Sequence, residues 1–167
     1  MQTGPGPVCI IGAGAAGAEL ALAFRHRYGA SADIHLIGRS ERVLPKRSRR
    51  ASQLLTRALK QNNITLHLGK AVSRITATDI HLFDKTKFAY AHIFLVTSAR
   101  PADWLRDLTV TKDADGYIQI SSSLQSVSNK HIFAAGDIAS ISGHPQEKAG
   151  VFAVRAGPVL CLSLIHI

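Results

Sequence analysis

The sequence predicts a three-layer α/β protein in which a parallel sheet, backed by helices, carries a β-meander. Two observations predict this fold. The first 40 residues have the pattern of a strand, a glycine turn, a helix and a second strand. After Ile64 the apolar residues change from helical spacing to alternation, which is typical of short strands. The 167 residues allow one domain of about 150 residues, or one domain and part of another.

The opening βαβ unit has clear boundaries. The apolar run Pro7–Ile11 predicts a strand that ends at a glycine. Residues 18–28 are rich in Ala and Leu, contain no Pro or Gly, and are followed by Gly29, which predicts a helix ending there. Asp33–Ile37 predicts the second strand, ended by Gly38.

The later elements follow from local patterns. Ser48–Asn62 predicts a helix that Ser48 or Ser52 could cap. Alternation from Ile64 onward predicts several antiparallel strands that lead into a buried strand. The remaining predictions are that buried strand at Ile93–Thr97, strands at Tyr117–Ile120 and His131–Ala135, and a helix at Gly150–Leu160.

A glycine motif separates the first strand from the first helix. Gly12 permits a tight turn, Gly14 lets the backbone approach a pyrophosphate, and Gly17 lets the helix pack close to the strand. Backbone N–H groups at the helix start, around Ala15 and Ala16, are unsatisfied donors with a partial positive charge, so a phosphate fits there. With its flanking strands and helix in place, the motif predicts dinucleotide binding. The alternative is a purely structural glycine turn.

The residues after the second strand indicate which nucleotide, NAD or NADP, the site prefers. NAD-preferring sites usually place an acid there, which binds the ribose 2′-hydroxyl. Arg39 stands about 20 residues past the glycines, where a guanidinium could pair with a 2′-phosphate, although Glu41 could still serve a ribose. The pattern favours NADP slightly. The alternative is that Arg39 and Arg42 are exposed loop cations.

The chain carries 20 Lys and Arg against 11 Asp and Glu, a net charge of +9. Such an excess indicates nucleic acid, an acidic membrane surface or anionic small molecules. No aromatic residue occurs between Arg39 and Lys60, so the stacking surface of single-stranded nucleic-acid binders is missing there. A solvated basic face and a cationic approach to a phosphate-bearing cofactor both fit. The cations in that stretch are Arg39, Arg42, Lys46, Arg47, Arg49, Arg50, Arg57 and Lys60.

Other chemistries find no support in the sequence. Cys9 and Cys161 form no Cys-x-x-Cys pair, which argues against a redox dithiol, a disulfide scaffold and a zinc site. The eight histidines show no ligand spacing, so no metal is predicted. No apolar run reaches the roughly 20 residues of a membrane-spanning helix. Without a basic leader before the first apolar stretch, a cytoplasmic location is expected.

Several stretches in order resemble a known family. These are GAGAAGAELALAF, IHLIGRSERVLP, the meander, TSARP, DGYIQI, LQS and HIFAAGDIAS. Together they resemble the pyridine nucleotide–disulfide oxidoreductases, flavoproteins with two dinucleotide-binding domains. The sequence is most similar to members without a redox disulfide, the type II NADH dehydrogenase-like proteins. HPQEKAGVFAVRAGP resembles in particular the flavoprotein module fused to selenide, water dikinase.

The resemblance covers about residues 6–161 and implies a domain organisation. Residues 1–100 would form a Rossmann-type NAD(P)H-binding domain and residues 101–161 the returning segment of an FAD-binding domain. The chain would then be a fragment, because the family's separate FAD-binding glycine motif is missing. Leu162–Ile167 breaks the family pattern and equals the translation of an adapter used in sequencing libraries, so we expect a non-native tail there.

The resemblance also implies site residues. Glu19 would lie near the nicotinamide and the flavin edge; the alternative is a surface Glu in the first helical turn. Ser98 stands where the family has Gly after Thr97, at a close backbone approach. Asp137, after Gly136, would hydrogen-bond the ribityl chain of FAD; the alternative is an N-cap or turn aspartate.

The expected function is that of an FAD-dependent NAD(P)H oxidoreductase. Hydride would pass from NAD(P)H to flavin and on to a quinone or another small-molecule acceptor. Because the cofactors carry this chemistry, no catalytic side chain is predicted, and the chain alone is expected to be inactive. The alternatives are a nucleotide-binding module without turnover, attached to a selenide, water dikinase-like enzyme, and a basic nucleic-acid-binding protein. We expect no nucleic-acid partner, and peripheral membrane association of the intact protein is left open.

Overall fold

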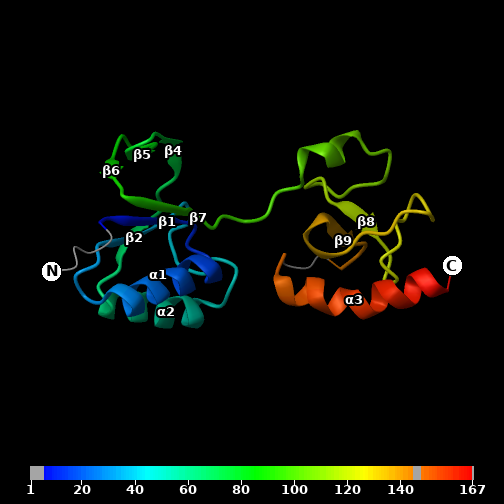
Figure 1. Cartoon of the computed structure of the whole chain (residues 1–167), viewed down its shortest axis with the longest axis horizontal. Helices are drawn as coiled ribbons and strands as arrows, with labels where there is room; N and C mark the ends of the chain where they lie inside the picture. The colour runs from blue at the N-terminus through cyan, green and yellow to red at the C-terminus, as the bar shows by residue number, and fades with distance from the viewer. Residues whose placement is uncertain (1–5, 145–147, 167) are drawn as a thin grey trace. The chain divides into compact units, whose positions relative to one another are not determined.

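The computed structural model describes residues 6–144 and 148–166. The chain divides into two compact units, Met1–Thr97 (unit 1) and Ser98–Ile167 (unit 2). Figure 1 shows the elements of each unit. Along the described residues, no helix combines the length and apolar character needed to cross a bilayer.

Unit 1 is built on a parallel sheet of four strands, which confirms the predicted α/β class. The strands are β1 (Val8–Ile11), β2 (Ile34–Gly38), β3 (Thr65–Leu68) and β7 (His92–Leu95), in the order β3-β2-β1-β7. All neighbouring pairs are parallel, and β1 is buried along its whole length.

Two predictions for this sheet were wrong. The strand after Ile64 was expected in the antiparallel meander, but β3 pairs parallel with β2, because the helix between them carries the chain back to the same end of the sheet. The strand predicted at Ile93–Thr97 was expected to be buried, but β7 is an edge strand. Leu95 is consequently 63% exposed.

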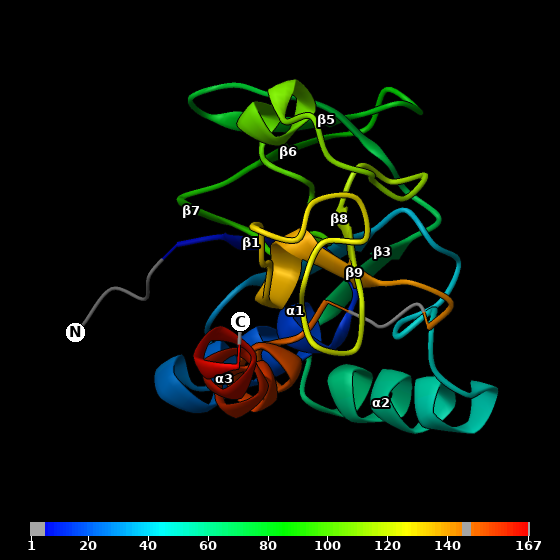
Figure 2. The ribbon, with the colours of Figure 1, turned by 90° about the vertical axis from the view of Figure 1, so that its right-hand side faces the viewer.

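Both helices of unit 1 lie on one face of the sheet, as Figures 1 and 2 show. They are α1 (Ala15–Tyr28), which ends at Gly29, and α2 (Arg49–Gln61). Ser48 caps α2, because its hydroxyl accepts a hydrogen bond from the Ala51 N–H at 3.2 Å. Ser52, the other predicted cap, is buried, and its hydroxyl donates to the Val43 carbonyl at 2.6 Å. Small residues of α1 and Leu59 of α2 complete the core of this face.

Arg25 joins the ends of the two helices. Its guanidinium donates to the carbonyl oxygens of Asn62, Asn63 and Gly29, each at 2.7 Å, and the residue is only 8% exposed. These acceptors lie just past the last residues of α2 and α1, where helix carbonyls lack intrahelical partners. One buried cation therefore satisfies the backbone at both helix ends.

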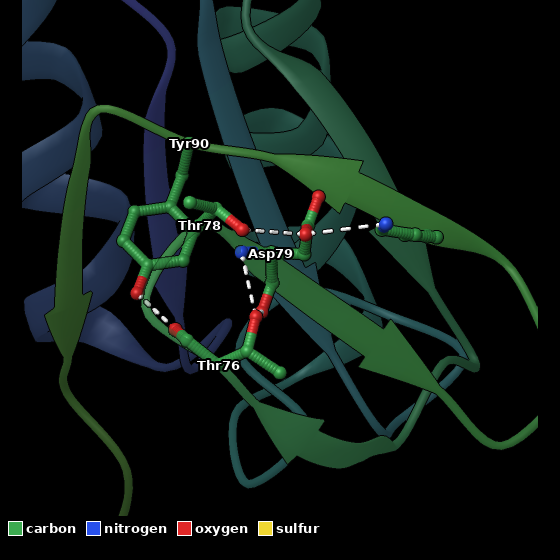
Figure 3. Close-up of polar contacts among 5 residues, drawn as sticks. Thr76, Thr78, Asp79 and Tyr90 are labelled. Atoms are coloured by element: carbon green, nitrogen blue, oxygen red, sulfur yellow. Dashed lines mark hydrogen bonds and ion pairs between the residues drawn. The ribbon is translucent and has the colours of Figure 1, made fainter.

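The opposite face of the sheet carries the predicted antiparallel meander, formed by β4 (Val72–Ile75), β5 (Asp79–Leu82) and β6 (Lys87–Ala89). Ile80 and Leu82 of β5 pack against Cys9 and Ile37 of the sheet. Figure 3 shows the turn before β5. There the Thr76 hydroxyl accepts from the Asp79 N–H at 3.0 Å, and the Tyr90 hydroxyl donates to the Thr76 carbonyl at 2.6 Å.

Unit 2 holds a two-stranded parallel sheet of β8 (Ile118–Ile120) and β9 (Ala139–Ile141), with the helix α3 (Gly150–Ile165) packed against it. Two short 3-10 helices, η1 (Asp103–Asp107) and η2 (Gly136–Ile138), complete its elements. Leu105, Ile118 and Ile120 form the centre of its core.

The prediction of a strand at His131–Ala135 was wrong. That segment makes only an isolated bridge, between Phe133 and Gln125, and the strand β9 begins after Gly136. The last helix was predicted to end at Leu160, but it extends to Ile165, into the predicted tail, whose last residue, Ile167, lies outside the described residues. Residues 145–147 of the HPQEKAGVFAVRAGP stretch also lie outside them.

Candidate functional site

The turn between β1 and α1 is closed by two of its three glycines. Gly12 has a φ of +127°, and a Cβ there would lie 2.3 Å from the carbonyl oxygen of Val96, the residue after β7. A Cβ on Gly17 would lie 1.8 Å from the Gly12 carbonyl oxygen. Both distances are far shorter than the closest approach of two non-bonded atoms. Gly12 and Gly17 are therefore required for the strand, turn and helix to pack together.

Gly14 differs from the other two glycines. It is the N-cap of α1 in extended backbone, and a Cβ there would meet nothing within 4 Å. Ala15 and Ala16, which follow it, are exposed, and the first turn of α1 carries no acidic residue. The first N–H groups of a helix have no intrahelical acceptor and carry a partial positive charge. The structure thus leaves open space at an anion-attracting helix end, which fits a pyrophosphate.

The loop after β2 lies beside this turn. The Leu44 N–H donates to the Ala13 carbonyl at 2.9 Å, and a Cβ on Gly38 would lie 2.6 Å from the Ala13 Cβ. Arg39 follows directly, and its side chain is exposed without a hydrogen bond or ion pair among the described residues. The structure therefore brings Arg39 to the edge of the glycine turn with its guanidinium free to bind an anion.

Arg42 and Glu41 occupy different positions from Arg39. The alternative that made Arg42 an exposed loop cation was wrong, because Arg42 is half-buried. Its Nη2 donates to the Pro45 carbonyl at 2.6 Å, and its Nη1 is buried without a partner among the described residues. The Glu41 carboxylate lies over Gly69, where an added Cβ would come within 2.5 Å of Oε1. Glu41 thus covers the turn after β3.

Glu19 is exposed on α1 and makes no hydrogen bond or ion pair among the residues that the structure describes. It is the fifth residue of the helix, and the first turn contains no acid. The alternative that placed Glu19 in the first helical turn was therefore wrong about its position, and the stabilisation of that turn by its charge does not apply. Its predicted role near a nicotinamide stays a prediction.

The remaining predicted residues belong to unit 2. Ser98 is exposed outside the helices and strands, and its φ is not positive, so its backbone conformation tolerates a side chain where the family has Gly. Gly136 has a φ of +71° and opens η2. Asp137 follows it with an exposed side chain that accepts no hydrogen bond within the described part of the chain. A free carboxylate at this turn fits a hydroxyl-bearing ligand such as the ribityl chain of FAD.

Sequence reasoning missed a charged cluster next to Asp137, formed by Lys148, Tyr117 and Asp113. The Lys148 ammonium lies 4.0 Å from the centre of the Tyr117 ring and donates to the Ala139 carbonyl. Tyr117 in turn donates its hydroxyl hydrogen to the Ala99 carbonyl at 2.8 Å. These residues are scattered over the sequence, so no spacing marked them.

Burial and neighbouring charges shift the pKa values of these three residues. Burial lowers the pKa of Lys148, although the carboxylates of Asp113, Asp137 and Asp115 act in the opposite direction. Burial would raise the pKa of Asp113, but hydrogen bonds from Ser140 and from backbone N–H groups lower it overall. Burial and the nearby carboxylates raise the pKa of Tyr117. Lys148 is thus a partly desolvated cation that the carboxylates of Asp113 and Asp137 stabilise in its charged form.

The sequence model described as "Pyridine nucleotide-disulphide oxidoreductase" matches residues 1–157. This chain belongs to the pyridine nucleotide-disulphide oxidoreductase family. The family predicted from the sequence is thereby confirmed; the likeness to the selenide, water dikinase module stays a prediction. None of the curated protein sequences compared with the chain is significantly similar to it.

Solved structures of this oxidoreductase family have the same fold. The water-forming NADH oxidase from Lactobacillus brevis, bound to NADH, is 27% identical, with a TM-score of 0.80 over 95% of this chain and 36% of its own. An engineered, five-substitution variant of that enzyme, bound to NADPH, is also 27% identical, with a TM-score of 0.77 over 92% of this chain and 35% of its own. An FAD-dependent member from Desulfovibrio vulgaris is 22% identical, with a TM-score of 0.83 over 99% and 44%.

The descriptions of these structures name FAD, NADH and NADPH, the cofactors predicted from the sequence. The Rossmann-like fold is confirmed as well. The chain spans between about a third and less than half of the length of each of these oxidoreductases. The comparisons therefore establish the family and the fold of this chain.

Proposed function

We propose that this chain is the nucleotide-binding part of an FAD-dependent NAD(P)H oxidoreductase. One observation carries the proposal: Gly12 and Gly17 are closed against backbone while Gly14 faces open space at the start of α1. A turn that is only structural needs Gly12 and Gly17, but it gives no reason for open space at Gly14. Space of this kind at a helix N-terminus suits a bound pyrophosphate.

Each predicted residue receives a role in this proposal. Backbone N–H groups of Gly14 to Gly17, including those of Ala15 and Ala16, hold the pyrophosphate of the nicotinamide nucleotide. Glu19 orients the reacting end of that nucleotide, and Ser98 lies where the chain passes into unit 2. Asp137, presented by Gly136, accepts hydrogen bonds from the FAD ribityl chain. When bound, the reduced nucleotide supplies a hydride for the flavin, and this chain's residues bind and orient.

We further propose that NADPH is preferred over NADH. The strand β2 ends at Gly38 and is followed by Arg39 and Ser40, and the Arg39 guanidinium is exposed and unpaired among the described residues. Three consecutive substitutions in the engineered oxidase bound to NADPH replace Asp-Ala-Met by Ala-Arg-Ser. The same order of a small residue, an arginine and a serine stands in this chain. A guanidinium pairs with a 2′-phosphate, whereas Glu41 is turned toward Gly69.

The electron acceptor is proposed to be a quinone or another small molecule, as the resemblance to type II NADH dehydrogenase-like proteins implies. The second candidate, a module without turnover attached to a selenide, water dikinase-like enzyme, rests only on the HPQEKAGVFAVRAGP stretch. Absorbance spectroscopy distinguishes the two in a protein that carries this chain together with the rest of its FAD-binding part. Bleaching of a bound flavin by NADPH supports the oxidoreductase, and nucleotide binding without bleaching supports the module.

The nucleotide site itself is tested on the 167-residue chain by isothermal titration with NADPH and NADH. Gly14→Val is expected to weaken NADPH binding at least tenfold, because its side chain fills the pyrophosphate space. The chain should stay folded, because that side chain meets no protein atom and only a favourable N-cap residue is lost. The matched control is Gly157→Val, another glycine with open space around its Cβ, on α3. If the folded wild-type chain binds neither nucleotide, or both variants bind equally, the proposal fails.

A further inference from the structure

The net positive charge of the chain lies in one unit. Residues 1–97 contain 14 Lys and Arg against 5 Asp and Glu, a net charge of +9, and residues 98–167 contain 6 of each. No acidic residue occurs between Glu41 and Asp79, a stretch with nine Lys and Arg. Unit 1 is thus strongly basic and unit 2 is neutral, which points to an anionic partner on unit 1.

The helix α2 concentrates this charge on one side. Leu59 and Ser52 are buried toward the sheet, and the opposite side is exposed. Arg50, Leu54 and Arg57 are spaced by four and three residues, so they form one exposed stripe. We call the exposed residues of α2 the basic helix face: Arg49, Arg50, Gln53, Leu54, Arg57, Lys60 and Gln61. In Figures 1 and 2 no element of unit 1 covers this side of α2.

The cations of the basic helix face are not used within the protein. None of its arginines, nor Lys60, makes a hydrogen bond or ion pair with another described residue. Arg49 and Arg50 also stand in the first turn of α2, where the helix dipole disfavours cations. The charges of the basic helix face therefore do not stabilise the folded chain. An external anion would neutralise them.

Leu54 narrows the class of partner. Its side chain is 59% exposed in the middle of the arginine stripe. A nucleic-acid phosphate backbone offers an isolated leucine no partner, and the helix carries no aromatic residue to stack on bases. A phospholipid interface binds cations at its headgroups and takes up an apolar side chain between them. The 13-residue helix, about 20 Å long, is able to lie along such a surface.

We propose that the basic helix face of α2 docks on anionic phospholipid headgroups, with Leu54 inserted between them. This docking is separate from nucleotide binding, because the Gly14 turn and Arg39 take no part in it. It assigns membrane contact to unit 1.

Vesicle sedimentation tests the proposal with the full 167-residue chain. Vesicles of phosphatidylcholine and phosphatidylglycerol (about 3:1) in 0.1 M NaCl should bind the chain, and pure phosphatidylcholine vesicles should not. Arg50→Gln/Arg57→Gln should weaken binding roughly 30-fold, and Leu54→Gln about fivefold. The matched control, Arg100→Gln/Arg155→Gln, removes the same charge from exposed positions of unit 2 and should change binding less than about threefold. Circular dichroism verifies that each variant is folded.

Two results would overturn the proposal. One is that the folded chain does not sediment with the anionic vesicles, or that the unit 2 control loses as much binding as the α2 variant. The other is that duplex DNA binds more tightly than the vesicles and Leu54→Gln weakens neither interaction, which would assign the face to nucleic acid. Loss of vesicle binding by Leu54→Gln with unchanged DNA binding supports docking on lipid.

Discussion

The Cβ position of Gly17 lies 1.8 Å from the carbonyl oxygen of Gly12, so the helix α1 rests directly on the backbone of the turn that precedes it. Gly14, between them, faces open space. Glycines of one motif thus serve different purposes. Gly12 and Gly17 determine whether the turn packs, and Gly14 determines what approaches it.

Substitutions at Gly17 and Gly14 should separate stability from binding. Gly17→Ala is expected to destabilise unit 1 by about 3 kcal/mol, because the methyl group overlaps backbone that cannot move alone. Gly14→Ser should change stability by less than about 0.5 kcal/mol, since serine is a favourable N-cap and the φ of Gly14 is −78°. Urea unfolding followed by circular dichroism measures both. Equal stability of the two variants would contradict the geometry of the turn.

Arg39→Ala should change the choice of nucleotide. The loss of a guanidinium that pairs with a 2′-phosphate is expected to weaken NADPH binding about tenfold or more and to leave NADH binding nearly unchanged. Isothermal titration of both nucleotides measures this ratio. Arg27→Ala, an exposed arginine near the other end of α1, is the control and should leave the ratio unaltered. A fall in affinity for both nucleotides alike would refute a role for Arg39 in selecting NADPH.

Two histidines should make unit 1 sensitive to acid. Nδ1 of His35 on β2 and Nε2 of His67 on β3 are hydrogen-bonded at 2.9 Å, and Asp33 lies 3.0 Å from the other nitrogen of His35. Burial, then the charges of His35 and Lys70, lower the pKa of His67 below 6.5. The unfolded chain therefore binds the proton more tightly, and stability should fall as the pH drops from 7 through 6.5 toward the folded-state pKa.

Urea midpoints measured between pH 7.5 and 5 test this dependence. His67→Gln retains an amide that can bond to His35 but removes the titrating group, so its midpoint should fall less with acid than that of the wild type. His26→Gln, at an exposed position of α1, should keep the wild-type slope. The interpretation fails if all three proteins show the same slope.

Lys85→Gly should stabilise the meander. Lys85 is exposed at a φ of +69°, in the turn between β5 and β6, a conformation that favours glycine. Glycine relieves that strain, and a gain of about 1 kcal/mol is expected. Ala77→Gly, in the preceding turn without a positive φ, should instead destabilise. Thermal unfolding compares the two, and a loss of stability with Lys85→Gly would show that the strain is compensated elsewhere.

The sequence predicted those elements that depend on local chemistry. The glycine turn, the end of α1 at Gly29 and the cap at Ser48 follow from backbone conformation and a single side chain. What failed depended on tertiary contacts. The alternation in Thr65–Leu68 is the same whether that strand pairs parallel or antiparallel, and the exposure of Leu95 depends on β7 being an edge. Lys148 and Tyr117 meet only after folding, so no spacing could indicate their contact.

Arg25 has a consequence for how the helix layer opens. Its guanidinium donates hydrogen bonds to carbonyl oxygens at the ends of both α1 and α2. Separating the helices would therefore leave a buried cation without some of its acceptors. Fraying from Asn63 alone is therefore costly. Amide protons in the last turns of the two helices should exchange with solvent through one shared opening event, with a single protection factor, instead of being lost turn by turn.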